Sequence, residues 1–272
     1  MDNESRLMDN DNKLAVLIDA ENVSSKYLKA ILDEISKYGI PTYKRIYGDW
    51  TTPQMTSWKS TLLENAIIPM QQYSYVSGKN STDSALIIDA MDILYTGNVD
   101  GFCIVSSDSD FTRLATRLRE AGRLVIGFGE KKTPSSFISS CNKFVYIEVL
   151  LTPEEPAAPV SINGAKPDTE HKEGTALGST KGEIMNSLRS ILNDISDDQG
   201  WALLSSVGSI LSKRHPDFDT RNYKCRNLTE FVKKLGQYEI DSRPTKDPKI
   251  RHNYIRLKPV TTKPLVAKKE KE

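Results

Sequence analysis

The chain has 272 residues, of which 38% are hydrophobic and 27% are charged, a composition that supports a packed core and excludes disorder throughout. Its three cysteines lie far apart, which excludes a zinc ribbon and a Cys-x-x-Cys redox motif and indicates a reducing compartment. The first twelve residues are polar and no apolar stretch reaches membrane-spanning length, so we expect a cytoplasmic protein without membrane contact.

The net charge of +1 is the sum of an acidic and a basic part of the chain. Residues 1–150 contain 16 lysines and arginines against 19 aspartates and glutamates, whereas residues 179–272 contain 19 against 12. A basic segment beside an acidic one favours an anionic polymer as the ligand.

Residues 13–149 alternate between strand-like and helix-like patterns, after a polar tail at 1–12. We expect strands at 14–18, 42–47, 67–73, 102–105, 124–128 and 144–147, and helices at 24–38, 54–65, 81–95 and 110–121. The helix at 81–95 is apolar almost all round, which predicts that it is buried. The alternation predicts an α/β domain with an open, mostly parallel sheet and helices on both faces.

Residues 150–179 show no periodicity and predict a flexible linker. The pattern then becomes mostly helical: we expect helices at 181–192, 201–213 and 228–235, and short strands at 238–242 and 254–257. Three helices and a hairpin within residues 180–258 predict a small winged-helix domain. Residues 259–272 are expected to form a basic tail.

Acidic residues follow two of the predicted strands. The first strand runs into Asp19 and Asn22, and the fourth runs through two serines into Asp108 and Asp110. Asp83 begins the helix before the fourth strand. Because ligands of open parallel sheets bind at the carboxyl ends of strands where the strand order reverses, we expect these side chains to converge there. Clustered carboxylates repel one another unless a cation lies between them, and oxygen ligands favour Mg²⁺ or Mn²⁺.

The composition of the first domain excludes several other kinds of site. Residues 1–150 contain no histidine, which excludes a Ser-His-Asp enzyme and argues against a zinc hydrolase, and no Walker loop is present. Carboxylate sites for Mg²⁺ hold phosphates and activate water, so the pattern favours phosphodiester hydrolysis. Asp89 and Asp92 lie further along the helix at 81–95 and are not assigned to the site.

Each acid also has a purely structural explanation. Asp83, Asp108 and Asp110 lie where predicted helices begin, and carboxylates there cap the helix and complement its dipole. Asp19 and Asn22 fit an ordinary turn between a strand and a helix. The metal site is the better explanation of the set because all four acids are expected at one edge of the sheet.

Three ordered motifs resemble a bacterial NYN domain, which belongs to the PIN-like nuclease group: Leu17–Asn22, Gly78–Asp83 and Ser106–Phe111. The resemblance covers about residues 12–148 and implies a PIN-like fold, a Mg²⁺ or Mn²⁺ site and ribonuclease activity, which we expect to be endonucleolytic. By match to these motifs, it implies that Asp19, Asp83, Asp108 and Asp110 bind the metal and that Asn22 positions a carboxylate or the substrate.

Residues 180–258 resemble the OST-HTH or LOTUS winged helix through Trp201–Gly208, Pro216–Tyr223 and Leu228–Leu235. That family is linked to RNA binding and, in some members, to protein contacts, so the resemblance implies RNA and a protein as partners. One departure from the family pattern is Lys224-Cys225, where a glycine-like turn is expected.

Basic and aromatic residues are the candidates for RNA contacts. Phosphates would be bound by basic side chains and bases would stack on an aromatic ring. The candidates are Lys79 in the first domain and Lys213, Arg214, Arg221, Tyr223 and Lys224 in the second. A solvated basic surface is the alternative explanation for the charged ones, and a place in the core is the alternative for the tyrosine.

The leading hypothesis is therefore a divalent-metal-dependent ribonuclease with a C-terminal RNA-binding module. A second hypothesis is a non-catalytic RNA-binding adaptor that uses the same two domains. A third is a small-molecule phosphatase, because an acid-tipped first strand also begins aspartyl-phosphate enzymes, although Glu21 only half fits the second acid of that pattern.

Overall fold

The strand β1 (Lys13–Asp19) is apolar on both faces, and this places it inside the first unit. Leu14 and Ile18 pack against one helix layer, whereas Ala15 and Leu17 pack against the other, and all four are fully buried. Strands that are buried on both faces belong to parallel sheets covered by helices on each side. The computed structural model describes residues 12–73, 81–151, 179–245 and 251–258.

Five further strands complete a parallel sheet with β1. They are β2 (Ile40–Gly48), β3 (Ile68–Gln71), β4 (Gly101–Val105), β5 (Leu124–Gly129) and β6 (Lys143–Tyr146). The strand order is β3-β2-β1-β4-β5-β6, so the chain runs outward in one direction from β1 and then returns to its other side at β4. The reversal between β1 and β4 is the place where α/β sheets bind ligands, and the α/β fold expected from the sequence is confirmed.

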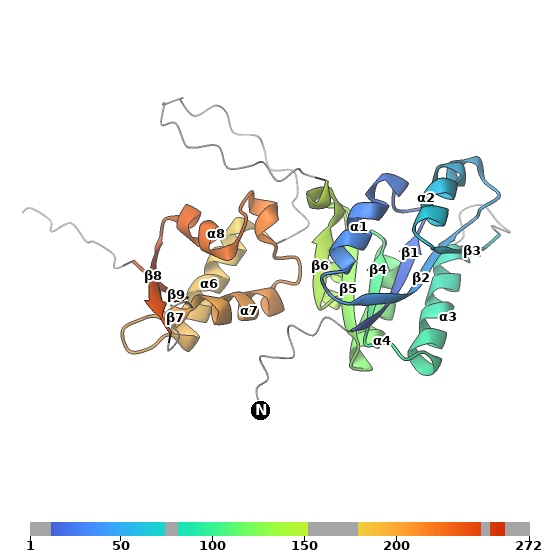
Figure 1. Ribbon diagram of the computed structural model, residues 1–272. Helices are drawn as coiled ribbons and strands as arrows, with labels where there is room; N and C mark the ends of the chain where they lie inside the picture. The colour runs from blue at the N-terminus through green and yellow to red at the C-terminus, as the bar shows by residue number, and fades with distance from the viewer. Residues whose placement is uncertain (1–11, 74–80, 152–178, 246–250, 259–272) are drawn as a thin grey trace, which may run out of the picture. The chain divides into compact units, whose positions relative to one another are not determined.

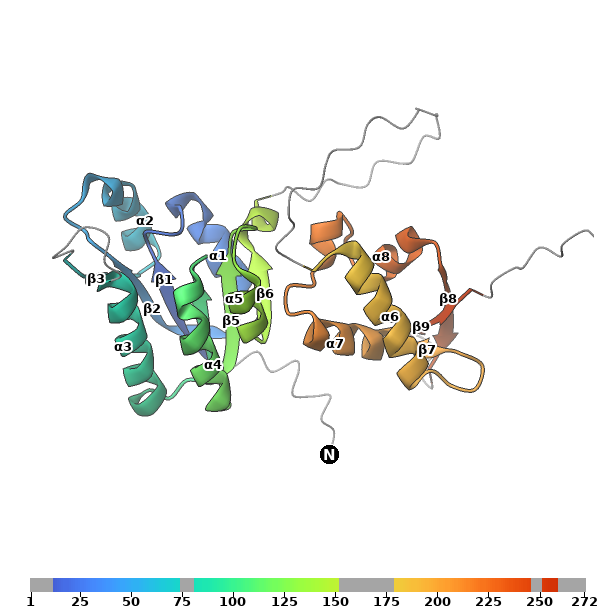
Figure 2. The same cartoon turned by 180° about the vertical axis from the view of Figure 1, so that it is seen from behind.

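Helices cover both faces of this sheet (Figures 1 and 2). One layer contains α1 (Leu28–Ile35) and α2 (Lys59–Glu64), and the other contains α3 (Ser81–Thr96), α4 (Thr112–Glu120) and α5 (Ser135–Ser140). Each layer has its own apolar cluster, and the buried strands β1 and β4 contribute to both. The centre of the sheet is therefore the most rigid platform in the unit, and the acidic residues lie at its edge.

Three of the expected helices begin with a tighter turn than predicted. The helix expected at 24–38 starts as a 3₁₀ turn (Ser25–Tyr27) and becomes α-helical only at α1, and the helix expected at 110–121 starts with the 3₁₀ turn η4 (Ser109–Phe111). Such turns are common at helix N-termini, where backbone N–H groups have no partner one turn earlier. The same occurs before α2, which follows the 3₁₀ segment η3 (Pro53–Trp58).

The strand β2 includes a proline that the sequence places just before it. Pro41 lies inside Ile40–Gly48, at a shift in the register between β1 and β2 that falls at Leu14 and Ala15. Proline has no N–H to donate to a neighbouring strand, and it is tolerated in a sheet at such an irregularity.

The prediction that the helix at 81–95 is buried all round is wrong. α3 packs on the sheet through Leu86, Ala90 and Ile93, whereas Ile88 is 63% exposed and Tyr95 is 69% exposed. The two exposed residues are seven positions apart, so they lie on one outward face. α3 covers the sheet from one side. The face of the helix that points toward the sheet is therefore buried, and the opposite face is exposed.

The short helix α5 was not expected from the sequence. Its six residues are mostly serine and give no helical period, and only Phe137 and Ile138 carry large apolar side chains into the core. Tertiary packing, rather than local preference, therefore determines this segment.

The second unit contains three helices and an antiparallel sheet. The helices are α6 (Lys181–Ile195), α7 (Leu204–Arg214) and α8 (Leu228–Leu235), and the strands are β7 (Ala202–Leu203), β8 (Tyr238–Pro244) and β9 (Arg251–Leu257). The hairpin strands β8 and β9 were expected, and β7 adds a two-residue edge to β9. The described residues divide by their contacts into a unit up to Thr180 with Ser212–Asp219, and a unit of Lys181–Leu211 with the residues from Thr220 onward.

Local hydrogen bonds fix both ends of α8. The Asn227 side chain accepts a hydrogen bond from the Glu230 N–H, and the Glu230 carboxylate accepts one from the Arg226 N–H, which resembles a capping box. Gly236 ends the helix with a φ of 74°. Nearby, Lys224 has a φ of 55°, so a lysine adopts the left-handed conformation at the position where the sequence predicts a glycine-like turn.

None of the helices in the described ranges combines the length and the apolar character needed to cross a membrane.

Asp89 belongs to a structural cluster rather than to the acidic edge of the sheet. Its carboxylate accepts hydrogen bonds from the Arg45 guanidinium and from the hydroxyl of Tyr47, which is fully buried. Burial and the neighbouring carboxylate both raise the pKa of Tyr47, so its hydroxyl stays protonated and donates. This cluster ties α3 to β2 and thereby fixes the helix that carries Asp83.

We predict that Asp89→Ala lowers the free energy of unfolding by about 2–3 kcal/mol, because it leaves a half-buried guanidinium and a buried hydroxyl without their acceptor. Asp92→Ala on the exposed face of the same helix is the matched control and should change stability by no more than about 0.5 kcal/mol. Urea denaturation of both variants makes the comparison, and equal losses would contradict a structural role for Asp89.

Candidate metal centre

The candidate site lies at the carboxyl ends of β1 and β4, which are neighbours in the sheet. The last paired residues of the two strands are Ile18 and Val105, and the chain continues from them into Asp19 and into Ser106. Fully buried strands end here at an edge, so short polar side chains follow at once. Two acid-bearing segments that are almost ninety residues apart in the sequence are thus held side by side.

Asp19 is fully buried and its carboxylate is held by three hydrogen bonds. Its Oδ1 accepts from the Glu21 N–H at 3.0 Å, and its Oδ2 accepts from Asn22 Nδ2 at 2.6 Å and from the Ser106 hydroxyl at 2.8 Å. Burial raises the pKa of Asp19, and these hydrogen bonds act in the opposite direction because they stabilise the charged form. Asn22 thus contacts a carboxylate, and its role in positioning that carboxylate stays a prediction.

The buried hydroxyl of Ser106 connects the two acidic segments. It donates to Asp19 and accepts from the Asp108 N–H at 3.1 Å. The neighbouring Ser107 hydroxyl accepts from the Glu130 N–H at 2.8 Å and so ties the segment after β4 to the end of β5. Sequence reasoning quoted both serines as part of a motif but gave them no role, and their position between a buried strand and two acids was the available signal.

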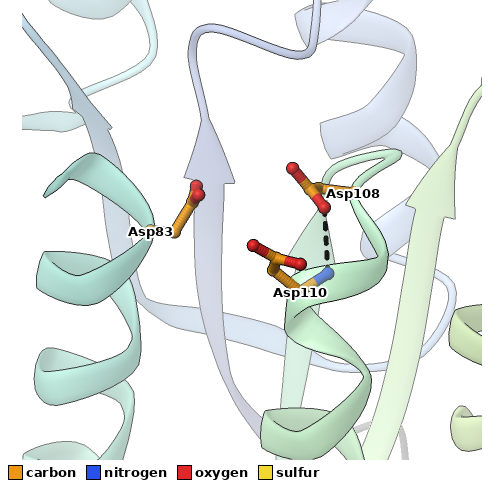
Figure 3. A group of neighbouring side chains, drawn as sticks. All are labelled: Asp83, Asp108 and Asp110. Carbon is orange, nitrogen blue, oxygen red and sulfur yellow. Dashed lines mark hydrogen bonds between the residues drawn. The ribbon is translucent and has the colours of Figure 1, made fainter. Parts of the chain in front are cut away.

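Asp108 and Asp110 lie on the tight turn that follows β4 (Figure 3). Asp108 caps η4, since its Oδ1 accepts from the Asp110 N–H at 2.9 Å. The capping explanation is therefore correct for one oxygen of Asp108. Asp110 lies in the first turn of η4, where its exposed carboxylate complements the helix dipole.

Asp83 faces these two acids from the first turn of α3 (Figure 3). Asp83, Asp108 and Asp110 each offer a carboxylate oxygen, and these oxygens lie within 4.8 Å of one another. Partial burial raises the pKa of Asp83 to about 6, and the charges of Asp19, Asp108, Asp110 and Glu21 add to this shift. Several negative charges therefore lie close together at the site. Within the described residues, no basic side chain forms an ion pair with Asp83.

Glu21 and Thr82 join the turn after β1 to the start of α3. The Thr82 hydroxyl, which is almost fully buried, donates to the Glu21 Oε1 at 3.0 Å. This contact positions Asp83 relative to Asp19, because Asp83 directly follows Thr82 and Asp19 lies two residues before Glu21. Sequence reasoning considered Glu21 only as a poor match to a phosphatase and did not find Thr82.

The structure brings three of the four predicted acids into one group and leaves the fourth beside it. Asp19 lies outside the group of three, and it influences Asp83 through charge rather than through contact. Lys79, the predicted phosphate contact, lies outside the described residues.

The RNA contacts predicted within residues 180–258 differ in exposure. Lys213 and Arg214 end α7 and are exposed, and Lys224 is exposed as well. Arg221 is only partly exposed. Tyr223 is partly exposed, its ring lies 4.8 Å from that of Phe231, and its carbonyl accepts a hydrogen bond from Lys234, so it packs on the surface of α8.

Comparisons with known protein families agree with both units. The NYN domain model matches residues 13–148, and the OST-HTH/LOTUS domain model matches residues 179–250. NYN domains are nuclease-type domains of the PIN-like superfamily, and LOTUS domains bind RNA.

Three similar proteins are described without an activity. An uncharacterized protein of Methanocaldococcus jannaschii is 24% identical over 146 residues, which are 52% of this chain and 58% of that protein, so the match spans little more than half of the relative. A crystal structure of a protein of unknown function from Vibrio parahaemolyticus is 21% identical, with a TM-score of 0.43, over 51% of this chain and 94% of that one. A solution structure from Chromobacterium violaceum is 35% identical, with a TM-score of 0.23, over 27% of this chain and 78% of that one.

The three converging carboxylates occur at the strand reversal of a PIN-like sheet, and the family model covers that whole sheet. The chain belongs to the NYN domain family, and an OST-HTH/LOTUS domain follows its NYN domain.

Proposed function

We propose that the protein is a divalent-metal-dependent ribonuclease, an endonuclease that hydrolyses RNA phosphodiester bonds. The observation that carries the proposal is the group Asp83, Asp108 and Asp110, whose oxygens lie within 4.8 Å of one another at the ligand-binding edge of the sheet. Three carboxylates at this separation are set to share a small cation, and the nuclease-type family of the domain favours RNA hydrolysis over other uses of such a cation.

The residues present fit Mg²⁺ or Mn²⁺. All three candidate ligands are carboxylates, which suit these cations better than zinc. Burial raises the pKa of Asp83 and the neighbouring carboxylates add to the shift, and a bound cation would relieve that repulsion. When bound, such an ion would neutralise a phosphodiester and lower the pKa of an attacking water. Asp110 is the most exposed of the three, so the group is accessible to a polymer from that side.

Asp19 is proposed as a fourth acid of the site. A carboxylate oxygen accepts about two hydrogen bonds, so Oδ2 is occupied by Asn22 and Ser106, while Oδ1 accepts one within the described residues, from the Glu21 N–H. Oδ1 therefore retains capacity for the cation or for a water next to it. Asn22 acts as the positioning residue that keeps this carboxylate in one orientation.

The second unit is proposed to hold RNA for the first. It belongs to an RNA-binding family, and the segment from residue 179 to the end of the chain has seven more basic than acidic residues. Two sites on one chain raise the local concentration of substrate at the acidic edge. The expected protein partner of this unit, and the cytoplasmic location expected from three unpaired cysteines, stay predictions.

Replacing single acids by the isosteric amide should abolish cleavage while the fold remains. We predict that Asp83→Asn, Asp108→Asn and Asp110→Asn each reduce Mn²⁺-dependent or Mg²⁺-dependent cleavage of labelled RNA by roughly 100-fold or more, because each removes charge from the cation's ligands. Asp19→Asn should reduce it as well. Asp108→Asn retains a carbonyl oxygen that can cap η4, so its unfolding should remain close to that of the wild type.

Asp92→Asn is the control for this series because Asp92 is an exposed acid on the helix of Asp83, outside the group. Equal cleavage by wild type and Asp19→Asn would remove Asp19 from the site. Metal-independent RNA binding with no divalent-dependent turnover by the wild type would favour the adaptor, and turnover of a small phosphate ester without RNA cleavage would favour the phosphatase.

The raised pKa of Asp83 predicts how stability depends on pH without metal. Its pKa in the folded protein is about 6, above its ordinary value of 3.8, so the folded state holds the proton more tightly. The resulting destabilisation is absent below about pH 4, grows between about pH 4 and 6, and is complete above about pH 6. With a chelator present, the free energy of unfolding of Asp83→Asn should increase relative to that of the wild type by about 1 kcal/mol as the pH rises through this window. This value is reduced to allow for the partial exposure of Asp83.

Thermal unfolding of both proteins between pH 4 and 8 measures this difference. Added Mn²⁺ should stabilise the wild type above pH 6 and have a smaller effect on Asp83→Asn. A constant difference between the two proteins across the whole pH range would contradict the charge repulsion at Asp83.

RNA binding through residues 180–258 should depend on salt through exposed lysines. We predict that Lys213→Ala and Lys224→Ala each weaken RNA binding and lessen the slope of log K against log salt by about 0.7, the value for one phosphate contact on a single strand. Lys29→Ala, an exposed lysine on α1, controls for net charge. If the salt slopes of both variants equal the slope of Lys29→Ala, Lys213 and Lys224 belong to a solvated surface and do not contact RNA phosphates.

A further inference from the structure

A cavity of about 460 Å³ lies beside the acidic group, between the segments that follow β1 and β2. One wall is the turn from Ala20 to Ser25, and the other runs from Asp49 to Trp58 through η3. The volume is within the range of roughly 300–1,000 Å³ that small-molecule sites occupy. It is separate from the three carboxylates, none of which lines it.

Glu21, in the turn after β1, connects the cavity with the acidic group. Glu21 lines the cavity, and its N–H donates to the buried carboxylate of Asp19. Its Oε1 accepts from Thr82, the residue before Asp83. Among the hydrogen bonds of the described residues, the other oxygen of this exposed carboxylate has none, so it is available to a ligand in the cavity.

The lining is suited to a neutral polar ligand and unsuited to a phosphate. It contains no lysine or arginine, and its two charged side chains, Glu21 and Asp49, are acidic. Hydroxyl groups from Ser24, Ser25 and Ser57 add hydrogen-bonding capacity. The two acidic side chains would repel a phosphate group, whereas a ribose hydroxyl or a base amino group donates hydrogen bonds to carboxylates and hydroxyls.

Buried apolar side chains and hydrogen bonds form part of the walls of the cavity. Val23, Met55 and Trp58 contribute apolar surface and are each less than 10% exposed. On the opposite wall, Asp49 Oδ1 accepts hydrogen bonds from the Thr51 N–H and from Gln71 Nε2. A preformed apolar floor with polar groups around it is the usual form of a small-molecule site.

We infer that this cavity binds the ribose and base of the nucleotide next to the cleaved phosphodiester, and that Glu21 accepts a hydrogen bond from its 2′-hydroxyl. The inference rests on the proposed nuclease function for the position of the phosphate, which would lie at the acidic group on the far side of Glu21. The 2′-hydroxyl distinguishes RNA from DNA, so a carboxylate at this place makes the site selective for RNA.

The test uses neutral nucleosides, because they report on the cavity whether or not the protein cleaves RNA. Binding of the four ribonucleosides and their 2′-deoxy forms is measured by calorimetry on the full chain. Ser57→Trp fills the cavity and should weaken ribonucleoside binding by about tenfold or more, whereas Ser60→Trp, an exposed position on α2 outside the lining, should leave it unchanged.

Glu21→Ala tests recognition of the 2′-hydroxyl. The wild type should prefer ribonucleosides over deoxyribonucleosides by about tenfold, the value of one hydrogen bond to a charged group, and the variant should lose this preference. Glu21→Gln, which keeps an acceptor oxygen, should restore part of it. In RNA cleavage, Ser57→Trp should raise KM and leave kcat within about threefold, since the acidic group is untouched.

The outcomes separate the two proposals. Cleavage of RNA by the wild type together with unchanged nucleoside binding and KM in Ser57→Trp would overturn the cavity and leave the nuclease. Binding that depends on Ser57 in a wild type that cleaves no RNA would support the cavity and overturn the nuclease. An unchanged preference for ribonucleosides in Glu21→Ala would overturn the role of Glu21.

Discussion

The burial of one carboxylate, that of Asp19, is the constraint on which the rest of the site depends. A charge at the end of a fully apolar strand is stable only if its oxygens are hydrogen-bonded, and three donors from two segments supply this. In doing so they fix the turn after β1 and the serine after β4, and through them the positions of Asp108 and Asp83. The arrangement of the exposed acids is thus a consequence of satisfying a buried one.

Structure and chemistry are combined in single side chains at this edge. Asp108 uses one oxygen to cap a helical turn and presents the carboxylate to its neighbours, and Glu21 braces α3 while it borders a cavity. The capping explanation and the metal explanation, which the sequence left as alternatives, are therefore compatible. The apolar clusters on both sheet faces hold this edge in place.

The strands, the strand-end position of the acids and the alternation of elements could be predicted because they depend on local apolar runs, as in Leu14–Ile18. The bridging role of Ser106 could not, since it depends on two segments meeting in space, and the exposed face of α3 could not, since it depends on where the sheet ends. The short helix α5 has no local signal at all. Lys224 is the opposite case: the departure from a glycine-like turn was visible in the sequence, and its positive φ confirms that the turn is retained.

The electrostatics of Asp83 have a consequence for the history of such chains. Asp83, whose pKa is raised by burial and by its acidic neighbours, destabilises the folded protein at neutral pH unless a cation is present, whereas Asp108 stabilises a helical turn in any case. A chain that is not selected for catalysis would gain stability by losing Asp83 and would lose stability by losing Asp108. The residue at position 83, and not the more noticeable pair after β4, is therefore the position whose identity reports whether selection has maintained the site.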